Sequence, residues 1–305
     1  MRKSFSNTIK KIAKNDDKIV FLTGDLGFNA LEDLRLLMGE RFINCGVAEQ
    51  SMISIAAGMA HKGFSVFCYS IAPFVVYRAL EQIRNDVCFH NLPVFIVGNG
   101  GGYGYGIMGP THHAIEDISC MSCLPNMQCY IPAFIEDLDF SLSEIIHLKT
   151  PAYLRLGLGN MAFENSNIIN GIRHNVLNKN PIITIASSGP IVSNIIEATK
   201  KNNNYDMFSF FKMPISNLEN KFVDSIKKSK KLLIVEEHVT RGGFAENLCL
   251  LLIELQINIS VTICSAKGYP GNLYGNQKFH QKLSELDADS LNNTIFEILN
   301  DNKNV

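Results

Sequence analysis

The sequence predicts an α/β protein with two doubly wound domains, a first domain on a mainly parallel sheet and a smaller second one. Short apolar runs rich in β-branched residues alternate with longer stretches of helical period, as parallel βαβ units require. The alternation fades near residue 157 and resumes at Pro181. A length of 305 residues leaves room for two domains with buried sheets.

The first domain is expected at residues 1–160, with six strands joined by crossover helices. Apolar residues at helical spacing predict helices at Val47–His61, Pro73–Cys88 and Glu136–Leu148. The apolar runs expected to form the strands are Lys18–Thr23, Arg41–Cys45, Ser65–Ser70, Pro93–Val97, Gln128–Ile131 and Ala152–Leu156.

Residues 161–178 lie in a Gly- and Asn-rich stretch without periodicity, which is typical of an exposed linker between domains. The second domain is expected at residues 179–305, where the alternation resumes. Its expected strands are Pro181–Ala186, Tyr205–Phe211, Lys231–Val235 and Ile259–Ile263, and its expected helices are Ile191–Lys200, Ser216–Lys228 and Gly243–Leu255.

The composition argues against several classes of partner. Lys+Arg 28 against Asp+Glu 29 gives a net charge of -1 without charged blocks, so no nucleic-acid surface is expected. Apolar runs stay shorter than the roughly 18 residues that a membrane helix needs, and the first residues lack an apolar signal core. We expect a soluble cytoplasmic protein with no membrane contact.

The eight cysteines fall mostly in apolar runs, where a thiol behaves as a small hydrophobic group. Cys120 and Cys123 form a Cys-x-x-Cys pair, but no second pair and no histidine follow at ligand spacing. We therefore expect core thiols, without a disulfide or a metal site.

Ligands of open α/β sheets bind beyond the carboxyl ends of the strands, so the loops that follow strands matter most. In Gly46–Gln50 a strand ends at a glycine and a helix begins with Glu49. Glu49 could merely complement the helix dipole. Because the following helix is too apolar to face water, its carboxylate is expected at the mouth of a buried helix, which also fits a functional role.

Residues 98–113, called the glycine loop below, contain more glycines than a simple connection needs. They match neither a dinucleotide fingerprint nor a P-loop, so the glycines indicate close backbone approach or movement. The loop ends in His112 and His113, which can exchange protons near neutral pH. The structural alternative is that one histidine packs in the core and the other faces solvent. The position of both histidines in a loop favours the catalytic interpretation.

A third loop places Phe74 and Tyr77 after a strand, where they would ordinarily be core residues. Together, the loops resemble the pyrimidine-binding domain of the thiamine-diphosphate transketolases. Deoxyxylulose-phosphate synthases and dehydrogenase E1 β subunits share this architecture. The motifs that carry the resemblance are Gly24-Asp25-Leu26, Gly46–Gln50, Phe74 with Tyr77, Gly109-Pro110-Thr111-His112 and, for the family's C-terminal domain, Val235–His238 with Gly242-Gly243.

The resemblance implies roles in binding thiamine diphosphate. Glu49 would hydrogen-bond the aminopyrimidine ring, whose imino tautomer removes the proton from thiazolium C2. Phe74 would stack on the pyrimidine, with Tyr77 or Ile71 flanking it. Asp25 would lie near the cofactor.

The resemblance also implies roles at the substrate. His112 would handle protons there, with His113 as a second participant. Where family members that use sugar phosphates carry a His, an acidic residue and an Arg, this chain has Gly100 or Gly101, Met108 and Leu158. Arginine is hard to replace for phosphate, so ordinary pentose phosphates are disfavoured. We expect Met108 and Arg155 beside His112 at the substrate, although Arg155 lies within a strand.

The family's diphosphate domain, with a Gly-Asp-Gly motif and a later Asn that bind magnesium, has no counterpart in this sequence. We therefore expect one subunit of a split enzyme, whose N-terminal-type partner holds the Mg, in an α2β2 heterotetramer with homodimeric contacts. The leading hypothesis is transfer of a two-carbon ketol unit from a ketose to an aldehyde, with small sugars as substrates. A pyruvate-using synthase, an E1 β-like subunit and a non-catalytic scaffold are the rivals.

Overall fold

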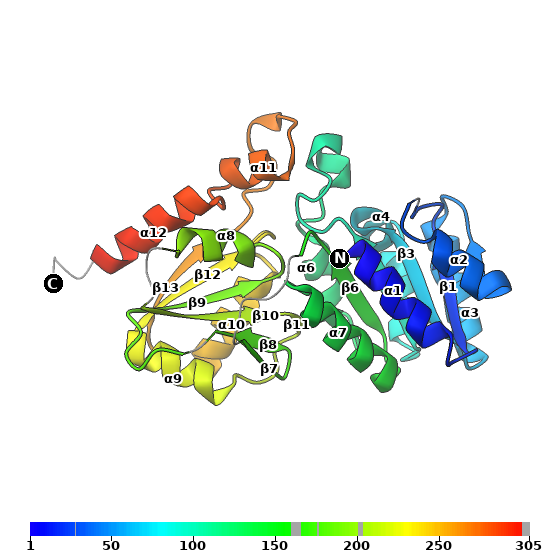
Figure 1. Ribbon diagram of the computed structural model, residues 1–305, viewed down its shortest axis with the longest axis horizontal. Helices are drawn as coiled ribbons and strands as arrows, with labels where there is room; N and C mark the ends of the chain where they lie inside the picture. The colour runs from blue at the N-terminus through cyan, green and yellow to red at the C-terminus, as the bar shows by residue number, and fades with distance from the viewer. Residues whose placement is uncertain (28, 160–165, 176, 201–203, 301–305) are drawn as a thin grey trace.

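The structure, a computed structural model, describes residues 1–27, 29–159, 166–175, 177–200 and 204–300. It consists of two α/β lobes that lie side by side, each with a central sheet covered by helices (Figure 1). The predicted fold class is confirmed by these two mainly parallel sheets. No helix in the described ranges is both long and apolar enough to cross a membrane.

The first sheet has seven strands in the order β11-β5-β6-β4-β3-β1-β2. All its pairs are parallel except that between β11 and β5. Strands β3, β4 and β6 are buried along their whole length, as expected when helices cover both faces. The strands are β1 (Ile19–Thr23), β2 (Phe42–Asn44), β3 (Ser65–Ile71), β4 (Val94–Asn99), β5 (Gln128–Tyr130), β6 (Ala152–Leu156) and β11 (Lys212–Met213).

Two helices of the first lobe match the expected positions, and one expected helix is broken. Residues 73–88, expected as one helix, form three short segments. Ala79 leaves helical geometry at φ -111° and ψ 14° between the first two, and the helix changes to π-helical hydrogen bonding between the second and the third. The helical segments are α1 (Arg2–Ala13), α2 (Glu32–Met38), η1 (Gly39–Arg41), α3 (Glu49–His61), α4 (Ala72–Tyr77), α5 (Leu80–Gln82), η2 (Ile83–Cys88), η3 (Gly106–Met108), η4 (Pro110–His112), α6 (Asp117–Ser122) and α7 (Ile135–Leu148).

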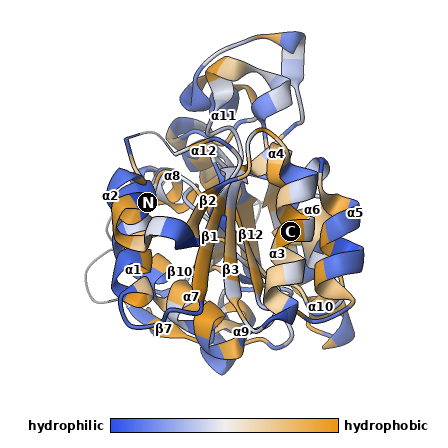
Figure 2. Cartoon of the chain, turned by 90° about the vertical axis from the view of Figure 1, so that its right-hand side faces the viewer, coloured by the Kyte–Doolittle hydropathy of each residue, from blue (hydrophilic) through white to orange (hydrophobic). Residues whose placement is uncertain are grey.

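Helices α1 and α2 were not expected. The core face of α1 consists of Phe5, Ile9 and Ala13, which recur every four residues and pack against the sheet. Polar and basic residues fill the rest of α1, so its apolar stripe is narrow. Figure 2 shows the general pattern, with hydrophobic strands at the centre and hydrophilic residues on the outer faces of the helices.

The second sheet has six strands in the order β13-β12-β9-β10-β8-β7. Its four expected strands and three expected helices are present, and α11 and α12 are additional. The elements are β7 (Asn167–Ile169), β8 (Ile172–His174), β9 (Ile183–Ser188), α8 (Val192–Ala198), β10 (Tyr205–Phe210), α9 (Asn220–Ser229), β12 (Lys231–Glu236), α10 (Phe244–Glu254), β13 (Ser260–Cys264), η5 (Pro270–Asn272), α11 (Gln277–Leu283) and α12 (Ala288–Asn300).

Part of the expected linker is regular structure. Residues 161–165 and 176 lie outside the described residues, but β7 and β8 form an antiparallel hairpin that joins the second sheet through β10. Its turn is Asn170-Gly171, with φ values of 51° and 79°. Asn-Gly is the usual pair for such a two-residue turn, so the signal was present in the sequence. The exact division into domains stays a prediction.

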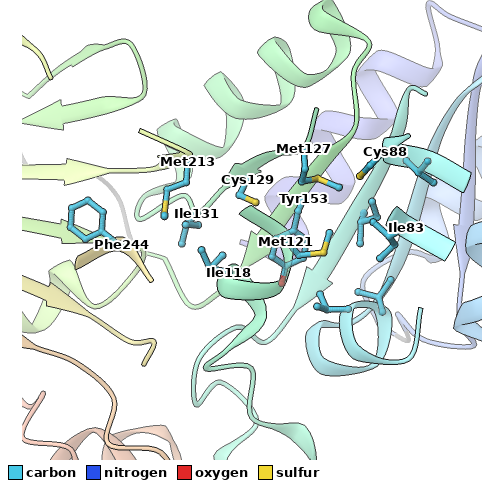
Figure 3. Packing of buried hydrophobic residues seen from close by; sticks show 14 of the residues in the cluster. Ile83, Cys88, Ile118, Met121, Met127, Cys129, Ile131, Tyr153, Met213 and Phe244 are labelled. Carbon is cyan, nitrogen blue, oxygen red and sulfur yellow. The ribbon is translucent and has the colours of Figure 1, made fainter. Parts of the chain in front are cut away.

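The two lobes share one hydrophobic core. Ile118 and Ile131 of the first lobe belong to the same buried cluster as Met213 and Phe244, which follow in the second half of the chain (Figure 3). Strand β11 also comes from the second half, yet it pairs with β5 in the first sheet. The second lobe is therefore continuous with the first in both packing and hydrogen bonding.

A buried ion pair lies at this junction. The Arg155 guanidinium is 3.0 Å from the Asp117 carboxylate, and both side chains are almost completely buried. Tyr153 donates a 2.6 Å hydrogen bond to Asp117, and Arg155 donates to the backbone carbonyls of Ala114 and Glu237. Arg155 thereby connects β6, α6 and the segment that follows β12.

We expect Arg155→Met to lower the free energy of unfolding by about 3–5 kcal/mol, because the Asp117 carboxylate would stay buried without its cation. Urea unfolding followed by circular dichroism measures the change. Lys10→Met is the matched control, since it breaks the surface pair with Asp33 at 3.0 Å and should cost about 0–1 kcal/mol. Equal losses in the two variants would contradict a structural role for the buried pair.

Candidate active site

Three of the residues singled out from the sequence lie in one cluster at the carboxyl ends of the parallel strands. Glu49 begins α3, Phe74 belongs to α4 directly after β3, and His112 ends η4 in the glycine loop. Two further residues, Ser70 and Arg78, complete the cluster. Glu49, Phe74 and His112 arrive through three different loops, as expected for a ligand site on an open α/β sheet.

Glu49 is buried, with 2 % of its surface exposed, but the expectation that the following helix avoids water is wrong, because Ser51, Ser54 and Ile55 of α3 are exposed. Ser70 donates a 2.9 Å hydrogen bond to Oε1, and Arg78 donates a 3.0 Å hydrogen bond to Oε2. A Cβ atom on Gly24 would lie only 3.3 Å from Oε1 and 3.2 Å from the Ser70 hydroxyl. Ser70 and Arg78 thus fix the Glu49 carboxylate. The space beside it is narrow, so position 24 suits a glycine.

Arg78 connects Glu49 to Phe74. Its guanidinium lies over the Phe74 ring, 4.0 Å from the centroid, while it donates to Glu49. The Arg78 side chain remains 46% exposed, so the cluster opens to the surface on this side. Glu49 and Phe74 thus hold a planar cationic group of the chain itself, the Arg78 guanidinium, by one hydrogen bond and one ring contact.

His112 lies on the other side of Phe74. The two ring centroids are 4.9 Å apart with the planes at 66°, and Nδ1 is 2.9 Å from the Thr111 hydroxyl. Partial burial is the larger cause that lowers the pKa of His112 below its usual value, and the positive charge of Arg78 is the smaller one. A neutral imidazole at physiological pH can accept a proton, which fits the role in proton handling that the resemblance implies.

His113 lies in a different environment from His112. It is buried and packs in an aromatic cluster with His280, Tyr103 and Tyr269 from both lobes. Its Nε2 is 3.4 Å from the Gly106 carbonyl, and burial lowers its pKa. These contacts match the packed histidine of the structural alternative, and its expected catalytic role gains no support from this position.

The other expected cofactor residues surround the cluster. Tyr77 is 39% exposed, and its hydroxyl donates a 3.0 Å hydrogen bond to Glu116. Ile71 is nearly buried at the end of β3. Asp25 follows Gly24 with a φ of 59° and accepts a 2.7 Å hydrogen bond from Asn44. All three lie at the same end of the sheet as Glu49, but their contacts with a ligand stay predictions.

The expected substrate residues differ in their accessibility. Met108, on η3, is half exposed, and Leu158 is largely exposed after β6. Arg155, by contrast, has its guanidinium in the buried pair with Asp117. This position gives the expected substrate role of Arg155 no support, because its cation is bonded in the interior at the junction of the lobes.

In the described part of the chain, no cluster of three or more His, Cys, Asp or Glu side chains could hold a metal ion. Cys68, Cys88 and Cys129 are buried as expected for core thiols. Cys45, Cys120, Cys249 and Cys264 are partly buried, and Cys123 is exposed, with its thiol 3.5 Å from the Cys120 carbonyl.

Sequence reasoning missed Ser70 and Arg78. Ser70 ends a buried apolar strand, and nothing in its local sequence sets it apart. Arg78 follows Phe74 by four residues, the spacing at which two side chains on one helix face meet. That spacing, beside a predicted aromatic site residue, was the available signal.

Residues 1–162 match the family model of the transketolase pyrimidine-binding domain. The chain is 28% identical to a 1-deoxy-D-xylulose-5-phosphate synthase of Clostridium perfringens, over 97% of this chain and 49% of that protein. It spans about half the length of that synthase. It is also 29% identical to the B subunit of apulose-4-phosphate transketolase from Phocaeicola vulgatus, over 85% and 86% of the two chains, and 30% identical to the B subunit from Actinobacillus succinogenes, over 83% of each.

Solved structures with the same fold include a split-gene transketolase described as an inactive beta4 tetramer. Its TM-score is 0.81 at 25% identity, and the match covers 98% of this chain and 97% of that chain. The transketolase of Campylobacter jejuni has a TM-score of 0.78 at 19% identity, over 97% of this chain and 46% of that one, which shows a shared fold.

Replacing Arg78 with Gln should raise the pKa of His112, because it removes a neighbouring positive charge that opposes protonation. An NMR titration of the imidazole Cε1 protons, assigned with His112→Asn, measures this pKa. Arg84→Gln is the control, since Arg84 bonds to exposed Asn85. An equal shift in both variants, or none in Arg78→Gln, would contradict the coupling.

Proposed function

The chain belongs to the transketolase family, and we propose that it is the pyrimidine-binding subunit of a split thiamine-diphosphate enzyme. The reaction we propose is transfer of a two-carbon ketol unit from a ketose donor to an aldehyde acceptor, in the cytoplasm. The observation that carries this proposal is the cluster of Glu49, Phe74 and His112 around Arg78. A scaffold protein would have no need to keep these side chains together.

The residues of the cluster fit an aminopyrimidine ring. Such a ring is planar, donates N–H groups and stacks on aromatic side chains, and Arg78 already makes both kinds of contact with Glu49 and Phe74. Glu49 and Phe74 would hold the ring, and Gly24 leaves room beside Oε1 of Glu49 for the Ser70 hydroxyl. When bound, thiamine diphosphate supplies the thiazolium carbon that carries the transferred unit.

Two side chains of this chain, Glu49 and His112, would take part in different proton transfers. Glu49 would hydrogen-bond a nitrogen of the aminopyrimidine ring through its buried carboxylate, while Ser70 fixes the carboxylate orientation. His112 is neutral near physiological pH and can accept a proton from a substrate hydroxyl. The contact between Thr111 and Nδ1 of His112 holds the imidazole orientation and leaves Nε2 for the substrate.

The proposed partner is a chain that holds the diphosphate and its Mg, with two copies of each chain in the complex. The names of several relatives support this division, since two of them are single subunits of a transketolase and one solved structure is a split-gene transketolase. The magnesium is assigned to the partner because the Gly-Asp-Gly motif that the family uses to bind it does not occur in this sequence.

A pyruvate-using synthase is the second candidate, because relatives named 1-deoxy-D-xylulose-5-phosphate synthase match 97% of this chain. The donor distinguishes the two reactions. The complex with the partner should release an aldehyde from a ketose donor and transfer the remaining two carbons to an aldehyde acceptor. Consumption of pyruvate with release of carbon dioxide, and no ketose cleavage, would favour the synthase.

This chain alone should bind thiamine diphosphate weakly and show no activity, because the proposed partner holds the diphosphate and magnesium. Isothermal titration of thiamine diphosphate with Mg²⁺ into the chain, and into the complex, compares the two affinities. Tight magnesium-dependent binding by the chain alone would contradict the split arrangement.

Glu49→Gln should slow exchange of the thiazolium C2 proton in the complex by about 10²–10⁴-fold, because an amide cannot share the activating proton. NMR of the quenched exchange reaction measures the rate. Glu40→Gln, which removes an exposed carboxylate of the same lobe, is the control and should leave the rate unchanged. Unchanged exchange in Glu49→Gln would assign cofactor activation to another residue.

A further inference from the structure

Glu116 joins the candidate active site to the second lobe. Its carboxylate accepts two hydrogen bonds of 3.0 Å, one at Oε2 from the Tyr77 hydroxyl and one at Oε1 from the Tyr269 hydroxyl. Tyr77 is the last residue of α4, whereas Tyr269 directly precedes η5 in the second lobe. One carboxylate thus bridges two tyrosine hydroxyls that come from different lobes.

The backbone on both sides of Glu116 is held in place. The carbonyl of Ile115 accepts a 2.9 Å hydrogen bond from the backbone N–H of Val239. Asp117 forms the buried pair with Arg155. Because these contacts lie one residue before and one residue after Glu116, its side chain extends from a fixed part of the backbone.

Tyr269 is also held in place, by contacts with the glycine loop. Its ring stacks on His113, with centroids 5.7 Å apart and planes at 18°, and the carbonyl of Gly268 accepts a 2.8 Å hydrogen bond from Tyr103. Burial, and after it the charge of Glu116, raises the pKa of Tyr269 above its usual value. The Tyr269 hydroxyl therefore stays protonated at physiological pH and donates to Glu116.

The Tyr77 side chain depends on this bridge more than its neighbours in α4 do. Helix α4 has six residues and its helical geometry breaks soon after Tyr77, so its last turn has little stability of its own. Val75 and Val76 are buried in the core, whereas Tyr77 is 39% exposed. Tyr77 follows Phe74 by three residues, so the two side chains are neighbours on the helix surface. The hydrogen bond to Glu116 thus orients a ring that lies next to Phe74.

We propose that Glu116 is a positioning residue of the candidate active site, which couples the second lobe to the cofactor-binding face of α4. This inference rests on the proposed function, because it requires that Tyr77 flanks the aminopyrimidine ring beside Phe74. Glu116 acts through Tyr77, and Tyr269 holds the carboxylate so that Oε2 faces Tyr77. The second lobe thereby has a role at the cofactor, although the site cluster belongs to the first lobe.

The bridge can be tested in the chain alone, without the partner or the cofactor. Tyr269→Phe removes one hydroxyl and keeps the ring that stacks on His113. In protein labelled with fluorotyrosine, the fluorine NMR resonance of Tyr77, assigned with Tyr77→Phe, should shift because Glu116 loses its second donor. Tyr274→Phe is the matched control, since Tyr274 is 68% exposed in the same segment, and it should leave that resonance unchanged.

The affinity of the complex for thiamine diphosphate, with Mg²⁺ and the partner present, distinguishes positioning from a merely structural role. Tyr269→Phe should raise the Kd about three- to tenfold, which is less than the roughly tenfold or larger effect of a directly broken hydrogen bond to a charged group. Glu116→Gln should act in the same direction, since an amide offers one acceptor oxygen to two hydroxyls. In a Tyr77→Phe background, Tyr269→Phe should have no further effect, because the bridge is already broken.

The turnover rate supplies a second measurement. At saturating cofactor, kcat of Tyr269→Phe should stay within about twofold of the unmodified complex, because the reacting groups are untouched and only cofactor binding is weakened. Tyr274→Phe should change neither the Kd nor kcat. Circular dichroism checks that each variant keeps the fold.

Several results would overturn the proposal. They are an unchanged Tyr77 resonance in Tyr269→Phe, an equal shift in Tyr274→Phe, or losses of cofactor affinity in Tyr77→Phe and Tyr269→Phe that simply add. A shifted resonance with unchanged cofactor affinity would also overturn it, since the bridge would then be structural only. No binding of thiamine diphosphate by the unmodified complex would instead refute the proposed function, and the resonance shift would still establish the hydrogen-bonded bridge.

Discussion

The buried pair of Arg155 and Asp117 is the interaction on which the geometry of the site depends. Each member of the pair compensates the buried charge of the other, and Arg155 also has partners in the surrounding backbone, so that part of the chain is held in place. Those partners include the carbonyl of Ala114, two residues after His112, and the carbonyl of Glu237 from the other lobe. A buried pair thus fixes the end of the glycine loop that carries the imidazole.

Contacts with the second lobe also explain why the glycine loop contains so many glycines. A Cβ on Gly102, at a φ of 65°, would lie 2.5 Å from a Glu237 oxygen, and one on Gly109, at 79°, would lie 2.1 Å from the Tyr274 ring. The Gly106 carbonyl is approached by the Nε2 atoms of both His113 and His280. Figure 1 shows α11 beside this loop. These glycines permit close approach to the protein's own second lobe, whereas their number alone predicted approach to a ligand.

The sequence predicted what depends on neighbours along the chain and missed what depends on distant ones. Runs of β-branched residues located the central strands, and Glu49, Phe74 and His112 were found because each follows a strand or ends a glycine-rich loop. Ser70 has no local feature that marks it, since its partner Glu49 is 21 residues away. The break in the helix at Ala79 was not predicted, because the apolar spacing of the sequence continues through it.

Strand β11 limits how this polypeptide can be rearranged during evolution. It leaves the second lobe to pair with β5, where Lys212 lies opposite Tyr130 and Met213 opposite Cys129. A gene cut between the two lobes would expose the edge of β5 and the apolar side chains around Met213. The two lobes therefore form one evolutionary unit. Only as a whole can this unit be exchanged, fused to another polypeptide or encoded by a separate gene.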